Sequence, residues 1–284
     1  MPLNRVSLNE VVERMHTIPT LPEVVNKLIK LVNDPDADAE SVGALVSRDP
    51  GIAAKMLRLV NSVYYGLNEP IHDLEHAVTV LGFKTLRSLA LSVSVISAFQ
   101  QQSACFSMKA YWTHSVVAGG IARMVATRCG LREPELAFTV GLLRHIGRLV
   151  LVENAPDETR AIIAVAHKLK WAFHRAAHEV VDTDDAEIGA WLAEHWELAP
   201  EIRDSIRHQY QPEKAPDPKV LAALHVADAI CARKGLRASG DYDDLQLNPD
   251  DVTLLGLRKD ALIDIMTAAT AEFEYARELL TGAV

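Results

Sequence analysis

The segment Gly141-Leu142-Leu143-Arg144-His145-Ile146-Gly147 is the most informative part of this chain of 284 residues. Arg144 and His145 stand side by side between apolar residues, with a glycine at either end. Arginine carries a permanent positive charge, five hydrogen-bond donors and no acceptor. Arg144 therefore cannot ligate a metal and would repel one, which argues against metal-dependent chemistry at this point.

Composition sets the class of protein. Hydrophobic residues make up 49% of the chain, enough for a sizeable core. The 38 Asp and Glu residues outnumber the 29 Lys and Arg residues, giving a net charge of −9, so nucleic acid is not an expected partner. Cys105, Cys129 and Cys231 form no C-x-x-C pair and are interpreted as reduced thiols of a cytoplasmic protein.

Helix signals recur along the chain. Ser7-Leu-Asn-Glu10 fits a capping box, and Asp49-Pro50 and Asn248-Pro249 are typical helix starts. Pro22 stands where the first residue of another helix is expected. The apolar run 89–99 is interrupted by serines and predicts a buried helix, not a membrane span. Sustained alternation of apolar and polar residues is absent from the sequence, so the predicted class is all-α.

Two polar segments divide this pattern. Gln100–Ala104 predicts a short joint between residues 1–104 and 105–284, too short to let the halves move freely. Gly235–Asp250 is acidic and is interpreted as a solvated surface loop. Its carboxylates lack the spacing of a calcium loop.

Four segments then occur in a specific order: Ile18–Pro22, Ser47–Gly51, Lys55–Ser62 and Ala77–Gly82. Together with the 141–147 segment they resemble the HDOD domain, the HD-related output domain of bacterial signalling proteins. This resemblance implies an N-terminal helical subdomain packed on a bundle shaped like an HD phosphohydrolase. The HDOD unit would span roughly residues 11–215, followed by C-terminal helices, and would have a regulatory role without established catalysis.

In HD phosphohydrolases the run corresponding to 141–147 reads Gly-Leu-Leu-His-Asp-Ile-Gly, and its His and Asp bind a divalent cation. The resemblance places Arg144 and His145 at those two positions. It also implies a vestigial pocket. In this pocket, Asp185 and His208 would occupy positions that bind metal in the subgroup that hydrolyses cyclic di-GMP. The pocket would comprise His114, Arg144, His145, Asp185, His208 and Asp228.

We interpret this pocket as a structural remnant with no catalytic residue, bound metal or cofactor. An adventitious zinc or nickel ion held by three of its histidines and aspartates is the alternative. Buried carboxylates without a metal need a fixed cation. Arg144 is therefore predicted to pair with Asp228 or Asp185, and His145 to bind the remaining carboxylate.

The N-terminal motif has structural and functional interpretations. Asp49 is expected to cap a helix and Arg48 to pair with a nearby acid, whereas Asn61-Ser62 is expected to end the same helix. Tyr64 and Tyr65 follow as core residues or half-exposed anchors. Contact with a partner is the alternative for the whole group.

These observations favour a non-enzymatic signalling or scaffold module that binds an unidentified signalling protein. The alternatives are a divergent metal-dependent phosphohydrolase acting on a nucleotide or cyclic dinucleotide, and a sensor that binds a nucleotide without hydrolysis. No membrane partner is expected, and the oligomeric state stays open.

Overall fold

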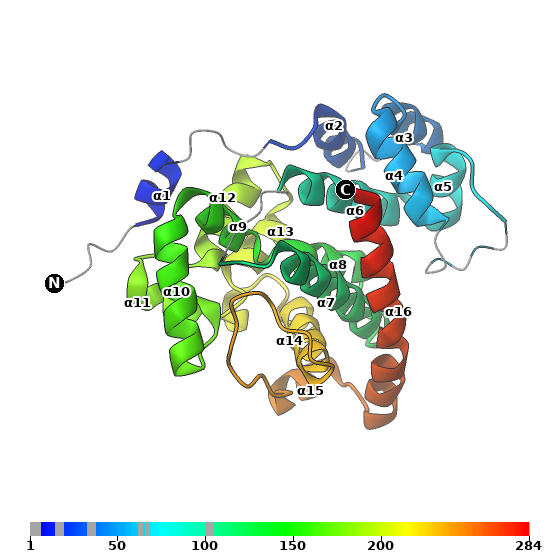
Figure 1. Cartoon of the computed structure of the whole chain (residues 1–284). Helices are drawn as coiled ribbons and strands as arrows, with labels where there is room; N and C mark the ends of the chain where they lie inside the picture. The colour runs from blue at the N-terminus through cyan, green and yellow to red at the C-terminus, as the bar shows by residue number, and fades with distance from the viewer. Residues whose placement is uncertain are drawn as a thin grey trace. The chain divides into compact units, whose positions relative to one another are not determined.

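The chain was analysed as a computed structural model, which describes residues 7–14, 20–32, 38–61, 65, 67, 69–99 and 105–283. These residues form helices joined by loops, which confirms the all-α prediction (Figure 1). Across the described ranges, the β interaction is an isolated bridge between Ser7 and Asp182. A search of the same ranges finds no helix with the length and apolar character needed to span a membrane.

The chain divides into two compact units, and each consists of two separate segments of the sequence. Unit 1 comprises Met1–Ile18 and Gln101–Ala269, and unit 2 comprises Pro19–Gln100 and Thr270–Val284. The last helix, α16 (Lys259–Ala283), therefore begins in unit 1 and ends in unit 2. The joint expected at 100–104 lies outside the described residues.

The described residues of unit 2 form five helices together with the end of α16. They are α2 (Glu23–Val32), α3 (Ala39–Val46), α4 (Pro50–Val60), α5 (Leu74–Leu81) and α6 (Phe83–Ala98). The predicted buried helix is α6, which buries Ser92 and Ser94 along with its apolar residues. The helix after Pro22 begins one residue later than expected, at Glu23.

Local capping explains several helix starts that the sequence predicts. The Asp49 carboxylate accepts hydrogen bonds from the backbone N–H groups of Gly51 at 3.0 Å and Ile52 at 3.1 Å, which confirms its capping role. In unit 1, the backbone N–H of Ser7 donates to Glu10 at 2.7 Å, as a capping box requires. These side chains satisfy backbone donors that a helix leaves unpaired at its start.

Asn61 ends α4 and ties it to the following loop. Its amide Nδ2 donates to the carbonyls of Leu57 at 2.9 Å and Ile71 at 2.7 Å, and its Oδ1 accepts from the N–H of Ile71 at 2.7 Å. All the hydrogen-bonding groups of the Asn61 amide are thereby used within the fold. The expected helix-stop role of Asn61 is confirmed.

The rest of the N-terminal motif is only partly described. Arg48 is exposed. Tyr65 is half-buried, and its ring meets that of Tyr275 edge to face with the centroids 6.0 Å apart. Ser62 and Tyr64 lie outside the described residues, so the partner-contact interpretation of this motif stays a prediction.

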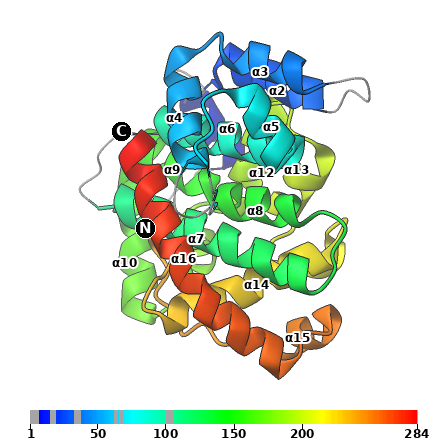
Figure 2. The same ribbon diagram turned by 90° about the vertical axis from the view of Figure 1, so that its right-hand side faces the viewer.

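Unit 1 contains the 141–147 segment. Its central helix is α7 (Met108–Arg128), which packs against α8 (Pro134–Leu143) and α14 (Pro218–Arg233), as Figure 2 shows. The other helices of unit 1 before α16 are α1 (Leu8–Arg14), α9 (Ile146–Asn154), α10 (Pro156–Leu169), α11 (Phe173–Val180), α12 (Asp185–His195), α13 (Pro200–Arg207), η2 (Pro212–Lys214) and α15 (Pro249–Leu255).

The two glycines of the 141–147 segment allow close helix contacts. A Cβ atom on Gly141, in α8, would lie 2.6 Å from the Cα of Gly119 in α7. A Cβ atom on Gly147, in α9, would lie 2.2 Å from the carbonyl oxygen of Asp185 at the start of α12. Glycine is therefore required at both ends of the segment, and the close contacts fix the turn between α8 and α9 that carries Arg144 and His145.

Candidate functional site

An ion pair joins the end of α8 to α14. The Arg144 side chain is 4% exposed, and its Nη2 donates to Oδ1 of Asp228. Nε2 of His114, on α7, lies 3.4 Å from the same carboxylate oxygen. Of the two predicted partners of Arg144, Asp228 and Asp185, the structure shows Asp228, and together with His114 this pair ties three helices of unit 1.

A second cluster surrounds Asp185, whose side chain is fully buried. Its Oδ2 lies 3.0 Å from Nδ1 of His145 and accepts from Nε of Arg148 at 2.7 Å. The Tyr210 hydroxyl donates to Oδ1 of Asp185 at 3.0 Å. The prediction that His145 binds the carboxylate not taken by Arg144 is therefore confirmed.

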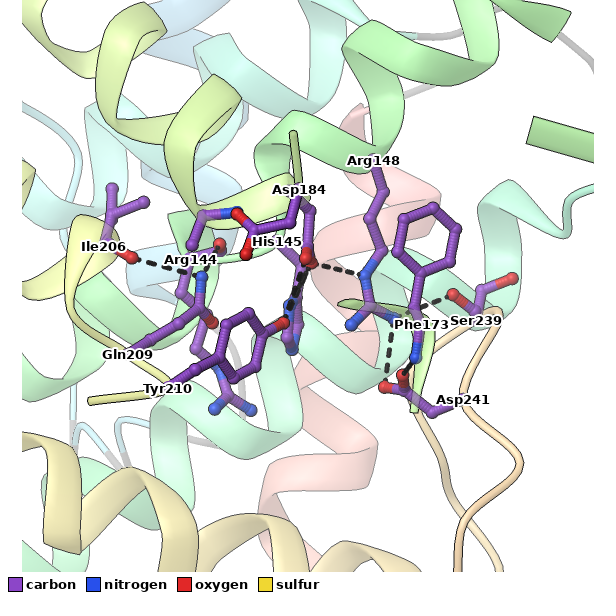
Figure 3. Close-up of polar contacts among 12 residues, drawn as sticks. Arg144, His145, Arg148, Phe173, Asp184, Ile206, Gln209, Tyr210, Ser239 and Asp241 are labelled. Carbon is purple, nitrogen blue, oxygen red and sulfur yellow. Dashed lines mark hydrogen bonds and ion pairs between the residues drawn. The ribbon is translucent and has the colours of Figure 1, made fainter. Parts of the chain in front are cut away.

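Arg148 links this cluster to the loop after α14. Its side chain is 1% exposed, and its Nη1 donates to the Ser239 carbonyl and to Oδ2 of Asp241, both at 3.0 Å (Figure 3). Oδ1 of Asp241 accepts from the backbone N–H of Phe173 at 2.7 Å. The interpretation of Gly235–Asp250 as a solvated loop is wrong for Asp241, because a buried arginine holds that carboxylate against the bundle.

The buried charges set the protonation of the site. Burial alone would raise the pKa of Asp185 and of Asp228, but Arg148 and Arg144 outweigh it and hold both pKa values well below the usual range. Burial, together with the charges of Arg148 and Arg144, lowers the pKa of His145 to about 3. His145 is therefore neutral at pH 7. Since its Nδ1 donates to Asp185, its Nε2 is an acceptor.

A cavity of about 290 Å³ opens between these groups. Four residues of the predicted pocket line it: His114, Arg144, His145 and Asp228. Asp185 does not line the cavity, but its carboxylate binds two residues that do, His145 and Tyr210.

His208 is not among the residues that line the cavity. The next residue, Gln209, lines it instead, and its Nε2 donates to the Arg144 carbonyl at 2.7 Å. Helix α13 ends at Arg207, so the chain leaves the helix at His208 and places the next residue, Gln209, at the cavity.

The described residues do not fit a divalent cation. Arg144 occupies a position that the resemblance assigns to a metal ligand, and its guanidinium already binds the aspartate at the last such position. Over the described part of the chain, no group of three His, Cys, Asp or Glu side chains is arranged to hold a metal ion. The alternative of an adventitious zinc or nickel ion therefore finds no ligand set within that part.

Three contributors to this site were not singled out from the sequence. Arg148 follows Arg144 by four residues in an apolar run, and a charged residue there signals a buried ion pair. Tyr210 and His174 line the cavity with their rings stacked 3.7 Å apart. No local pattern in the sequence points to the contact between His174 and Tyr210.

Comparison with known proteins places the fold among HD-related proteins. The HDOD domain matches residues 18–212. A candidate phosphohydrolase from Shewanella amazonensis SB2B is 27% identical, with a TM-score of 0.74 and coverage of 97% of this chain and 99% of that chain. An HDOD domain protein of unknown function from Geobacter sulfurreducens is 24% identical, with a TM-score of 0.74 and coverage of 97% and 95%.

A curated relative matches a smaller share of this chain. An uncharacterized protein of Treponema pallidum (strain Nichols) is 26% identical over 211 residues, which is 73% of this chain. The match spans only 40% of that relative's length. A candidate signal transduction protein from Marinobacter aquaeolei VT8 is 19% identical, with a TM-score of 0.76 and coverage of 99% of this chain and 67% of that one, and shares the fold.

Proposed function

The chain belongs to the HDOD domain family, and on that premise we propose that it is a non-catalytic signal-transduction output or scaffold module. It acts by binding another signalling protein in the cytoplasm. The fold shared with the Marinobacter signal transduction candidate is consistent with this role. Fold alone does not fix the partner.

One observation carries the proposal: the Arg144 guanidinium binds Asp228 where a catalytic metal would need a ligand. Metal-dependent hydrolysis requires an ion with an open coordination position for water. A permanent cation with no acceptor atom supplies neither. The pocket thus holds a permanent cation beside Asp228 and lacks the means to activate water.

A metal-dependent phosphohydrolase is the second candidate, because the Shewanella protein at 27% identity is a candidate phosphohydrolase. Under this alternative, Mn²⁺ or Fe²⁺ would displace Arg144 from Asp228. A sensor that binds a nucleotide without hydrolysis is the third, and the cavity next to Arg144 is the observation that favours it.

The test combines turnover, binding and capture. The purified chain is incubated with Mn²⁺ or Fe²⁺ and with nucleotides or cyclic di-GMP, and nucleotide binding is measured by calorimetry. The proposal expects no turnover and no nucleotide binding, together with saturable capture of a defined protein from the host. Turnover that Asp228→Asn abolishes would establish the phosphohydrolase, and stoichiometric nucleotide binding without turnover would establish the sensor.

A further inference from the structure

The cavity beside Arg144 does not offer free positive charge to a ligand. Arg144 and Arg148 are 4% and 1% exposed, and both guanidiniums bind carboxylates. Arg237, the third arginine of the lining, donates through Nη1 to the backbone carbonyl of Asp243. Each arginine of the wall therefore already binds an acceptor, and an anion would compete with it, although Nε of Arg144 has no partner among the described residues.

Acceptor atoms, in contrast, remain available. His114 and Arg144 both contact Oδ1 of Asp228, and neither of these contacts uses its Oδ2. Gln209 lines the cavity at 2% exposure, and its Oε1 also lacks a partner among the described residues. The neutral His145 adds its Nε2 as a further acceptor. The wall is therefore suited to a ligand that donates hydrogen bonds.

The charge balance leads to the same conclusion. The cluster contains three arginines and four aspartates, namely Arg144, Arg148, Arg237, Asp185, Asp228, Asp241 and Asp243. His225 pairs with Asp251 at 3.1 Å and adds no positive excess in either protonation state. Burial, and then the charge of Asp241, raises the pKa of Asp243, as expected where negative charge is incompletely balanced.

The shape of the cavity limits the ligand to a small molecule with an apolar part. Its volume of about 290 Å³ lies near the lower end for ligand pockets. Leu236, Ala238 and Leu245 contribute apolar side chains to the lining. Apolar walls with a few convergent polar atoms are typical of small-molecule sites.

We propose that this cavity binds a small organic monocation, such as an amine or an amidine carried on a flat apolar body. Asp228 and Asp243 contact the cationic group, and the leucines contact the apolar body. The site would serve as the ligand-sensing input of the module. Ligand binding is measured directly on the purified chain, so it stands or falls independently of whether a partner protein is found.

The test uses three probes of equal shape and different charge: benzamidine, benzamide and benzoate. Each is titrated into the full chain by calorimetry, with AMP as the nucleotide. We expect saturable binding of benzamidine at one site, at least about tenfold tighter than benzamide, because the neutral amide loses the charge interaction worth about 1.4 kcal/mol. Benzoate and AMP are expected not to bind.

A pair of neighbouring variants localises the effect. Asp243→Asn neutralises a carboxylate of the lining and is expected to weaken benzamidine binding about fivefold or more. Asp244→Asn removes the same charge one residue away, from a side chain that is 84% exposed and not in this lining, and is expected to leave binding unchanged. Melting curves followed by circular dichroism check that both variants fold.

Three results would overturn the proposal. The first is binding of benzoate or AMP at least as tight as that of benzamidine, which would make the cavity an anion site. The second is equally tight binding of benzamidine and benzamide, or no binding of either probe. The third is equal weakening by both variants, which would reflect the general field of the protein. If Asp243→Asn does not fold, the comparison of the three probes on the unaltered chain decides.

Discussion

Replacing Arg144 with alanine tests whether the Arg144–Asp228 pair holds unit 1 together. The two side chains are 4% and 14% exposed, so the pair is buried. Removing one partner of a buried pair leaves an uncompensated charge and costs about 3–5 kcal/mol. We expect the free energy of unfolding of Arg144→Ala to fall by about that amount at pH 7.

A surface pair provides the matched control. Arg128 and Asp264 also form an Arg–Asp pair, at 2.7 Å, but their side chains are 52% and 63% exposed. Solvent-exposed pairs contribute about 0–1 kcal/mol. Arg128→Ala should therefore lower the free energy of unfolding by less than about 1 kcal/mol, although it removes the same type of side chain.

The assay is urea denaturation followed by circular dichroism at pH 7 and pH 5. In Arg144→Ala, the buried Asp228 loses its cation, so its pKa rises above the value in the unfolded chain. A raised carboxyl pKa gives stability that is present at low pH and is lost as pH rises. The destabilisation by Arg144→Ala should accordingly be smaller at pH 5 than at pH 7.

Two outcomes would refute this reasoning. One is a decrease in the free energy of unfolding for Arg144→Ala that is no greater than the decrease for Arg128→Ala. The other comes from the double variant Arg144→Met/Asp228→Leu, which removes both charges and should recover most of the lost stability. A double variant as unstable as Arg144→Ala would mean that the uncompensated carboxylate is not the cause.

Three further predictions concern the rest of the chain. Folding lowers the pKa of His145 to about 3, so the unfolded chain takes up a proton before the folded chain does, and stability is lost as pH falls below about 6.5. His145→Asn removes this titrating group and keeps a donor for Asp185. In urea titrations, its free energy of unfolding should fall by about 2 kcal/mol less than that of the unaltered chain between pH 7 and pH 5. Gly147→Ala would place a Cβ atom 2.2 Å from the Asp185 carbonyl and should destabilise by about 1–3 kcal/mol or more, and an unchanged melting temperature would refute that close contact. Fragments 1–104 and 105–284 should each fail to fold, because each lacks a terminal segment of its own unit. The whole chain should give one calorimetric transition. Two resolved transitions or two stable fragments would contradict this prediction.

The sequence predicts the local features of the fold well. Helix caps such as Asp49 depend on residues two or three positions apart, so their hydrogen bonds can be anticipated from spacing. A pair between Arg144 and either Asp228 or Asp185 was also predictable, because a buried carboxylate needs a counter-charge and the family resemblance places all three residues in one pocket; the choice of Asp228 comes from the structure. Charge and the family resemblance are sufficient for this prediction, which requires no distance between the two side chains.

The remainder of the site depends on how distant segments meet. Asp241 is 93 residues from Arg148 and lies in a loop whose composition is typical of a solvated surface. Its burial follows from the position of Arg148, which no local pattern gives. At the end of α13 a difference of one residue determines that Gln209 lines the cavity and His208 does not, and helix ends are the least predictable part of an element.

The central claim is that Arg144 takes the place of a metal ion in this pocket, and metal stoichiometry tests it most directly. The purified chain is dialysed against chelator, offered Mn²⁺, Fe²⁺ or Zn²⁺, desalted, and measured by elemental analysis alongside an assay for cyclic di-GMP hydrolysis. We predict that no metal is retained in stoichiometric amounts and that no hydrolysis occurs. About two tightly held metal ions per chain, together with turnover of cyclic di-GMP, would contradict the claim.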